Sequence, residues 1–192
     1  MANIITDYVS ETGRLNLSRL MQNLAGIPRN TFVAQVTLPL LVSRKLWDGE
    51  LQKKGNTNTL IFSAKDMRAM TSPQVPAQID ENDVSSTVFI LRKSRFSATS
   101  PNHFLVGRMQ PADIVINDYS ISRNHAAIVI QPGRLALHDL GSTNGTYHGP
   151  IRLEKDQTQV IRPGDGITFG RLEFILTTSF EFYDQITGQK GS

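Results

Sequence analysis

The sequence predicts an all-β sandwich with a smaller N-terminal region of mixed α/β or helical character. Between Ser86 and Phe182, short apolar stretches alternate with turn signals, and no amphipathic helix is visible. Near the N-terminus, leucines instead recur at helical spacing and are followed by Gly26 and Pro28, which predicts a helix over about residues 14–25. We expect four segments: an N-terminal region of unknown role (1–70), a linker (71–85), the sandwich (86–182) and a tail (183–192).

The strands of the sandwich are expected where β-branched and aromatic residues lie between turn signals. Pro132 and Gly133 separate two of these stretches and suit a type II turn. The expected strands span residues 87–92, 103–108, 113–118, 125–131, 134–140, 158–162, 165–170 and 172–178, with a further short one over 180–183. Residues 31–51 are ambiguous, because Pro39 breaks a long helix while Val, Thr and Leu favour one or two strands.

Composition limits the classes of function. The chain has 192 residues, a net charge of +3 and no cysteine, so disulfides, thiolate metal sites and a cysteine nucleophile are all excluded. Such a small positive charge does not indicate a nucleic-acid partner. No secretory signal is visible, and the longest uncharged apolar stretch (30–43) falls short of the ~20 apolar residues of a membrane helix. We expect a cytoplasmic protein that does not insert into membranes.

Four polar motifs stand at the ends of the expected strands. They are Gly107-Arg108, Ser120–Ala126, Gly141–Thr146 and Gly164–Gly170. Arginines together with serine and threonine hydroxyls suit a phosphate group on a side chain, which carries about −1.5 to −2 charges and three acceptor oxygens. Arginine can bridge two of these oxygens, and neutral donors satisfy the remaining lone pairs.

The order and spacing of these motifs resemble the forkhead-associated (FHA) domain over about residues 86–178. The resemblance implies a sandwich of about eleven strands whose loops at one end bind a phosphothreonine peptide. It further implies a non-catalytic signalling adaptor without a cofactor. The partner would be a phosphothreonine-containing protein, such as a Ser/Thr kinase or its substrate.

The resemblance also assigns roles to individual residues. It implies phosphate binding by Arg108, Ser122, Arg123 and Thr143. It implies contacts with the peptide by Asn144, through the peptide backbone, and by Ser120, at a position that varies in the family. It gives structural roles in the site to Gly107, His125, Gly141 and Gly145.

A hydrolase is a competing interpretation, since Ser122, His125 and Asp139 supply the residue types of a catalytic triad. Ser122 lacks the strand-to-helix elbow of such nucleophiles, and its neighbour Arg123 suits anion binding. The other histidines show no metal-ligand spacing with acidic residues, so no metal site is expected. The sequence favours binding over catalysis.

Two further hypotheses remain open from the sequence. One is a structural or assembly protein that uses phosphate-independent contacts or dimerisation. The other is an intramolecular switch, in which a phosphorylated threonine such as Thr12 or Thr71 docks into the chain's own site.

Overall fold

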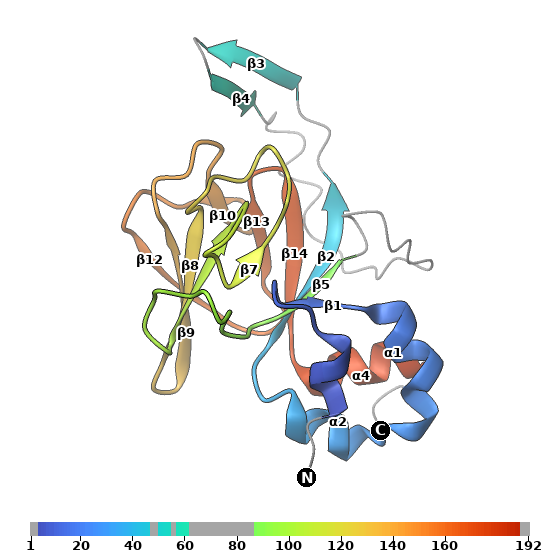
Figure 1. Cartoon of the computed structure of the whole chain (residues 1–192). Helices are drawn as coiled ribbons and strands as arrows, with labels where there is room; N and C mark the ends of the chain where they lie inside the picture. The colour runs from blue at the N-terminus through green and yellow to red at the C-terminus, as the bar shows by residue number, and fades with distance from the viewer. Residues whose placement is uncertain (1–3, 47–49, 55–56, 62–86, 189–192) are drawn as a thin grey trace.

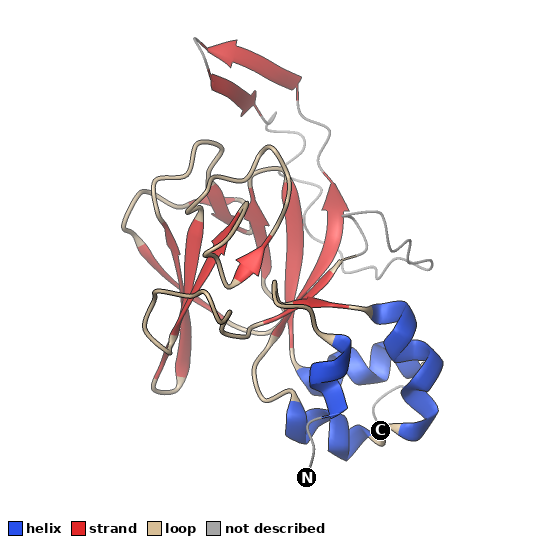
Figure 2. Ribbon diagram, in the orientation of Figure 1, coloured by secondary structure: helices blue, strands red, loops and turns tan. Residues whose placement is uncertain are grey.

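The structure, a computed structural model, describes residues 4–46, 50–54, 57–61 and 87–188. The expected linker (71–85) lies outside these residues. Two β-sheets form the body of the molecule and helices gather beside them (Figures 1 and 2). No helix among the described residues has the length and apolar character needed to cross a membrane.

The two sheets have seven and five strands, which confirms the predicted sandwich. The larger sheet has the order β1 (Arg14–Leu15), β5 (Val88–Ile90), β2 (Leu40–Leu46), β14 (Leu172–Thr177), β13 (Gly166–Phe169), β10 (Thr146–His148) and β11 (Ile151–Arg152). The smaller has the order β12 (Thr158–Ile161), β9 (Arg134–Asp139), β8 (Ala126–Gln131), β6 (His103–Gly107) and β7 (Ile114–Val115). Among the strands of the described residues, β6 and β7 alone pair in parallel. A separate hairpin joins β3 (Glu50–Lys54) to β4 (Thr57–Ile61).

The main core lies between the sheets and is rich in aromatic and branched side chains. Phe169 and Phe174 are fully buried, with ring centroids 5.9 Å apart, and Phe89 meets Phe174 edge-on at 6.0 Å. Ile128 and Leu137 of the smaller sheet belong to the same cluster. Close packing of this kind fixes the strand ends, and therefore the loops that follow them.

Strand β2 does not follow the expected division of the chain. It belongs to the sandwich, although its residues come from the predicted N-terminal region and not from 86–182. It pairs with β14 from Leu40↔Thr177 to Leu46↔Leu172, and with β5 on its other edge. The sandwich therefore begins before residue 86 and takes a central strand from the N-terminal region. The pairing joins residues far apart in the sequence, so the local pattern carried no sign of it.

A second core lies beneath the helices, which are η1 (Ile4–Tyr8), α1 (Leu17–Asn23), η2 (Leu24–Gly26), α2 (Arg29–Gln35) and α4 (Ser179–Thr187). Leu20 and Phe32 are fully buried, and the Phe32 ring lies 6.1 Å from Phe182 and 5.6 Å from Tyr183. The prediction of a strand over 180–183 was wrong, because these residues are helical in α4, which also extends into the expected tail.

The reason for a helix at this point is a capping box. The Thr178 hydroxyl oxygen accepts the N–H of Glu181 at 3.1 Å, and the Glu181 carboxylate accepts the N–H of Thr178 at 3.1 Å. These two bonds satisfy donors that a helix start otherwise leaves open, and Gly188 ends the helix in the left-handed conformation.

We expect Thr178→Ala to lower the free energy of unfolding by about 1 kcal/mol, because it removes this cap. Thr178→Ser keeps the hydroxyl and should retain most of the stability. Urea unfolding of the three proteins measures the difference. Equal losses in both variants would show that the threonine methyl, and not the cap, contributes the stability.

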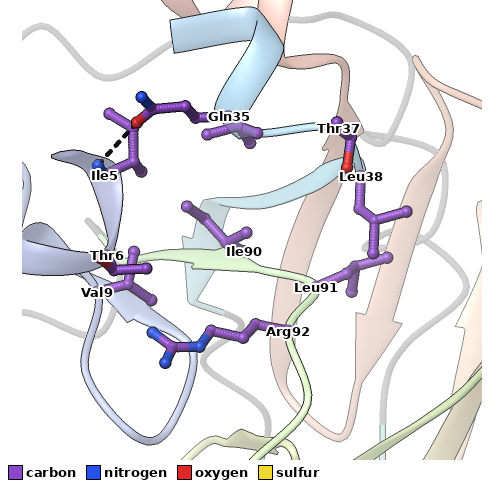
Figure 3. A pocket seen from close by; sticks show the side chains of 10 residues that line it. Ile5, Thr6, Val9, Gln35, Thr37, Leu38, Ile90, Leu91 and Arg92 are labelled. Carbon is purple, nitrogen blue, oxygen red and sulfur yellow. Dashed lines mark hydrogen bonds between the residues drawn. The ribbon is translucent and has the colours of Figure 1, made fainter. Parts of the chain in front are cut away.

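A pocket of about 210 Å³ lies where the helices meet the larger sheet (Figure 3). Its walls are mainly apolar and come from η1, residues 35–38 and the end of β5. Leu40 pairs with both Ile90 and Thr177, so the pocket and the helices lie at one end of β14. The start of β14 lies at the opposite end of the strand, away from the helices (Figure 1).

Candidate anion-binding site

The end of β6 lies directly against the loop that carries Ser122. The Arg108 backbone N–H donates to the Ser122 carbonyl at 3.0 Å. At Gly107, a Cβ atom would lie 2.0 Å from the Arg123 carbonyl oxygen, so only glycine permits this approach. The Gly107-Arg108 and Ser122-Arg123 motifs are therefore brought together by backbone contact, with Arg108 half-buried and Arg123 exposed.

The second contact joins this loop to residues 141–145. The Thr143 backbone N–H donates to Ser122 Oγ at 3.0 Å, and the two side-chain hydroxyls lie 3.4 Å apart. Thr143 is exposed and Ser122 is half-buried. One backbone N–H and two hydroxyls thus meet at the surface, where they can turn towards an anion.

His125 lies buried beneath these groups. Its Nδ1 accepts the Ser122 backbone N–H at 3.0 Å, which places the ring proton on Nε2, and Nε2 donates to the Gly145 carbonyl at 3.0 Å. Burial lowers the pKa of His125 to about 4, although its bond to Gly145 and the charge of Asp139 act in the opposite direction. A neutral imidazole therefore links the two loops.

The loop after β9 is held by Asp139. One of its carboxylate oxygens accepts the N–H groups of Gly141 and Ser142 at 2.8 and 2.9 Å, and the other accepts the Thr146 hydroxyl at 2.7 Å. Burial would raise the pKa of Asp139, but its hydrogen bonds, led by the one from the Ser142 hydroxyl (2.5 Å) and followed by the one from Thr146, lower it below its usual value. Gly141 and Gly145 have φ angles of +79° and +88°, which permit the sharp turns of the loop.

Ser120 and Asn144 differ from the four predicted phosphate-binding residues because both are buried. Asn144 Nδ2 donates to the Ser120 carbonyl at 2.8 Å, and Ser120 Oγ donates to Asp118 at 2.7 Å. Ser120 is 1% exposed, so its side chain has no open face for a peptide, in contrast to the expected contact. A contact between Asn144 and a peptide backbone stays a prediction.

Sequence reasoning missed three residues that support the loops. Asp139 was considered only as a triad member, although an Asp just before a Gly-Ser-Thr-Asn-Gly run is a signal for side-chain bonds to the following N–H groups. Asp118 and Arg171 form an ion pair with atoms 2.6 Å apart. No local pattern could have revealed that pair, since the two residues come from different loops.

The arrangement of Ser122, His125 and Asp139 does not match a catalytic triad. His125 Nδ1 accepts the Ser122 backbone N–H and not its hydroxyl, while Asp139 binds the 141–146 loop. All three residues hold backbone in place. Among the described residues, no group of three or more histidines, aspartates or glutamates is placed to hold a metal ion.

Comparison with known families supports the sequence resemblance. The family model described as FHA domain matches residues 104–170, which include every predicted site residue. The chain contains an FHA domain. The helices and strands β1, β2, β5 and β14 lie outside the matched residues of the FHA domain.

The chain is also similar to proteins named as regulators. The chain is 29% identical over 125 residues to the oxoglutarate dehydrogenase inhibitor of Corynebacterium efficiens, covering 61% of this chain and 85% of that protein. It is 32% identical over 85 residues to the glycogen accumulation regulator GarA of Mycolicibacterium smegmatis, covering 44% of this chain and 51% of that protein.

One similar solved structure comes from a structural and functional study of phosphothreonine-dependent FHA domain interactions. It is 29% identical, has a TM-score of 0.41, and the match covers 50% of this chain and 88% of the other.

Proposed function

We propose that this chain is a non-catalytic adaptor whose FHA domain binds phosphothreonine in partner proteins of Ser/Thr kinase signalling. The observation that carries the proposal is the meeting of Ser122 Oγ with the Thr143 N–H and hydroxyl beside Arg108. A phosphate oxygen would replace Ser122 Oγ as the acceptor of the Thr143 N–H. The Ser122 hydroxyl would then donate to the phosphate.

The energetics favour moderate, reversible binding. Each charge-assisted hydrogen bond contributes about 1.5–3 kcal/mol. A few such bonds, less the cost of ordering the peptide, give about 8 kcal/mol, which corresponds to a micromolar complex. Arg108 supplies the charge that a dianionic phosphate requires, and Arg123 is exposed on the same loop as Ser122.

The experiment that tests this function is a phosphopeptide screen. A library of phosphothreonine peptides and the same peptides without phosphate are offered to the whole chain, with phosphoserine versions as a third set. We expect retention of the phosphothreonine set alone, with selectivity over phosphoserine from a pocket for the threonine methyl. Equal retention of unphosphorylated peptides would favour the assembly hypothesis, in which contacts do not depend on phosphate.

We expect Ser122→Ala to weaken binding of a selected phosphothreonine peptide by about tenfold, the loss of one hydrogen bond to a charged group. Because the Ser122 backbone bonds remain, thermal stability should change little. Titration calorimetry measures the affinity, and Ser97→Ala in the β5–β6 loop serves as the matched control. An unchanged affinity in Ser122→Ala would remove this hydroxyl from the proposed site.

The intramolecular switch stays a hypothesis, as does the cytoplasmic location. Thr71 lies outside the described residues. The Thr12 hydroxyl lies 2.7 Å from that of Ser10, and its carbonyl accepts the Val115 N–H at 3.3 Å. If a phosphorylated threonine of this chain occupies the site, treatment with a kinase will block later capture of phosphopeptide.

A further inference from the structure

Tyr119 is an exposed aromatic side chain with one face already covered. Tyr119 is 47% exposed, and the Arg171 guanidinium carbon lies 4.3 Å from the centroid of its ring. Cation–π contact of this kind holds the ring in place without burying it. The opposite face of the ring therefore remains open to a ligand.

The guanidinium beneath Tyr119 is itself fixed. Arg171 Nε lies 3.1 and 3.0 Å from the two carboxylate oxygens of Asp118, and Nη2 lies 2.6 Å from one of them. Asp118 is 6% exposed and also accepts the Ser120 N–H at 2.8 Å. A forked ion pair with a buried carboxylate restricts both residues, so the orientation of the Tyr119 ring is set before any ligand binds.

The same contacts connect Tyr119 to the proposed phosphate site. Ser120, the next residue, accepts the Arg171 N–H at its Oγ (3.2 Å) and the Asn144 amide at its carbonyl (2.8 Å). Asn144 directly follows Thr143 in the loop. Tyr119 thus lies on the Asn144 side of the site. Arg108 lies on the Ser122 side, where its backbone N–H donates to the Ser122 carbonyl.

We propose that the open face of Tyr119 binds an apolar side chain of the phosphopeptide, on the Asn144 side of the phosphothreonine. The inference rests on the proposed function and extends it to the selection of partners. An aliphatic or aromatic side chain suits an aromatic face, which provides a large apolar contact. A basic side chain is disfavoured, because it would place a second cation near the Arg171 guanidinium.

The test is a set of phosphothreonine peptides in which each position from three before to three after the phosphothreonine is Leu, Lys or Ala in turn. Affinity is measured by fluorescence anisotropy for the wild type, Tyr119→Ala and Tyr119→Phe. We expect one flanking position at which the Leu peptide binds about three- to tenfold more tightly than the Ala peptide. At the same position, the Lys peptide should bind no more tightly than the Ala peptide. Tyr119→Ala should abolish that preference, and Tyr119→Phe should keep it.

The matched control is Phe96→Ala. Phe96 is 45% exposed and has the Arg95 guanidinium 4.7 Å from its ring centroid, so it resembles Tyr119 in chemistry. It lies in the β5–β6 loop, which leads into β6 at His103, the opposite end from Gly107. We expect the Leu preference to be unchanged in this variant.

The outcomes separate the two proposals. If the wild type binds phosphothreonine peptides but Tyr119→Ala keeps every positional preference, this inference is wrong and the proposed function stands. The inference also fails if Phe96→Ala removes the preference equally. If the wild type does not distinguish phosphorylated from unphosphorylated peptides, the proposed function itself fails.

Discussion

Replacing Arg108 with alanine is expected to weaken phosphothreonine-peptide binding by about 100-fold, the loss of two charge-assisted hydrogen bonds at a half-buried position. The backbone N–H of residue 108 would still donate to the Ser122 carbonyl, so the loops should keep their arrangement. The loss therefore reports on the guanidinium and not on the fold. Titration calorimetry at fixed salt, with thermal unfolding alongside, measures both effects.

Two further variants separate contact from overall charge. Arg108→Lys keeps the charge but cannot bridge two phosphate oxygens, so we expect it to recover only part of the affinity. Arg134→Ala removes the same charge from the start of β9, whereas the proposed site adjoins its end at Asp139. A loss in Arg134→Ala as large as that in Arg108→Ala would assign the effect to net charge and contradict the assigned contact.

Much of the sandwich could be predicted from the sequence because its signals are local. Strands β8 and β9 lie between turn residues, and Gly133 has the positive φ (+73°) that the expected turn requires. Strand β2 could not be assigned, because its partner β14 lies near the other end of the chain. The capping box of α4 was present in the sequence, yet the aromatic residues after Thr178 favoured a strand.

The candidate site shows the same division between local and long-range information. Its four motifs are short and ordered, so their resemblance to a family could be stated from the sequence. The burial of Ser120 depends on the turn at Gly170, where a Cβ atom would lie 2.6 Å from Ser120 Oγ. The support of Tyr119 likewise depends on Asp118 and Arg171, which lie 53 positions apart in the sequence. Contacts of this range follow from the packing of the sheets and leave no periodic signal.

The neutral state of His125 predicts that the FHA domain loses stability in mild acid. The pKa of its imidazole is about 4 in the folded protein, against 6.5 for an unperturbed histidine. Between these values the unfolded chain binds the additional proton, so stability falls as pH falls from 6.5 towards 4 and the loss is complete below 4. The expected loss in the free energy of unfolding is about 3 kcal/mol, because a pKa difference of one between the folded and unfolded states corresponds to about 1.36 kcal/mol. Urea unfolding at pH 7, 6, 5 and 4 measures it.

The variant His125→Gln identifies the residue responsible, because an amide can occupy the same position without titrating. We expect it to be less stable than the wild type at pH 7 and to show a smaller loss between pH 6.5 and 4. Asp113, Asp118 and Asp139 have lowered pKa values, so the stability they contribute is lost below about pH 4, beneath the histidine range. Direct titration of the His125 ring by NMR provides a check that does not depend on a variant. A midpoint near 6.5 would contradict the buried neutral imidazole and its role in linking Ser122 to Gly145.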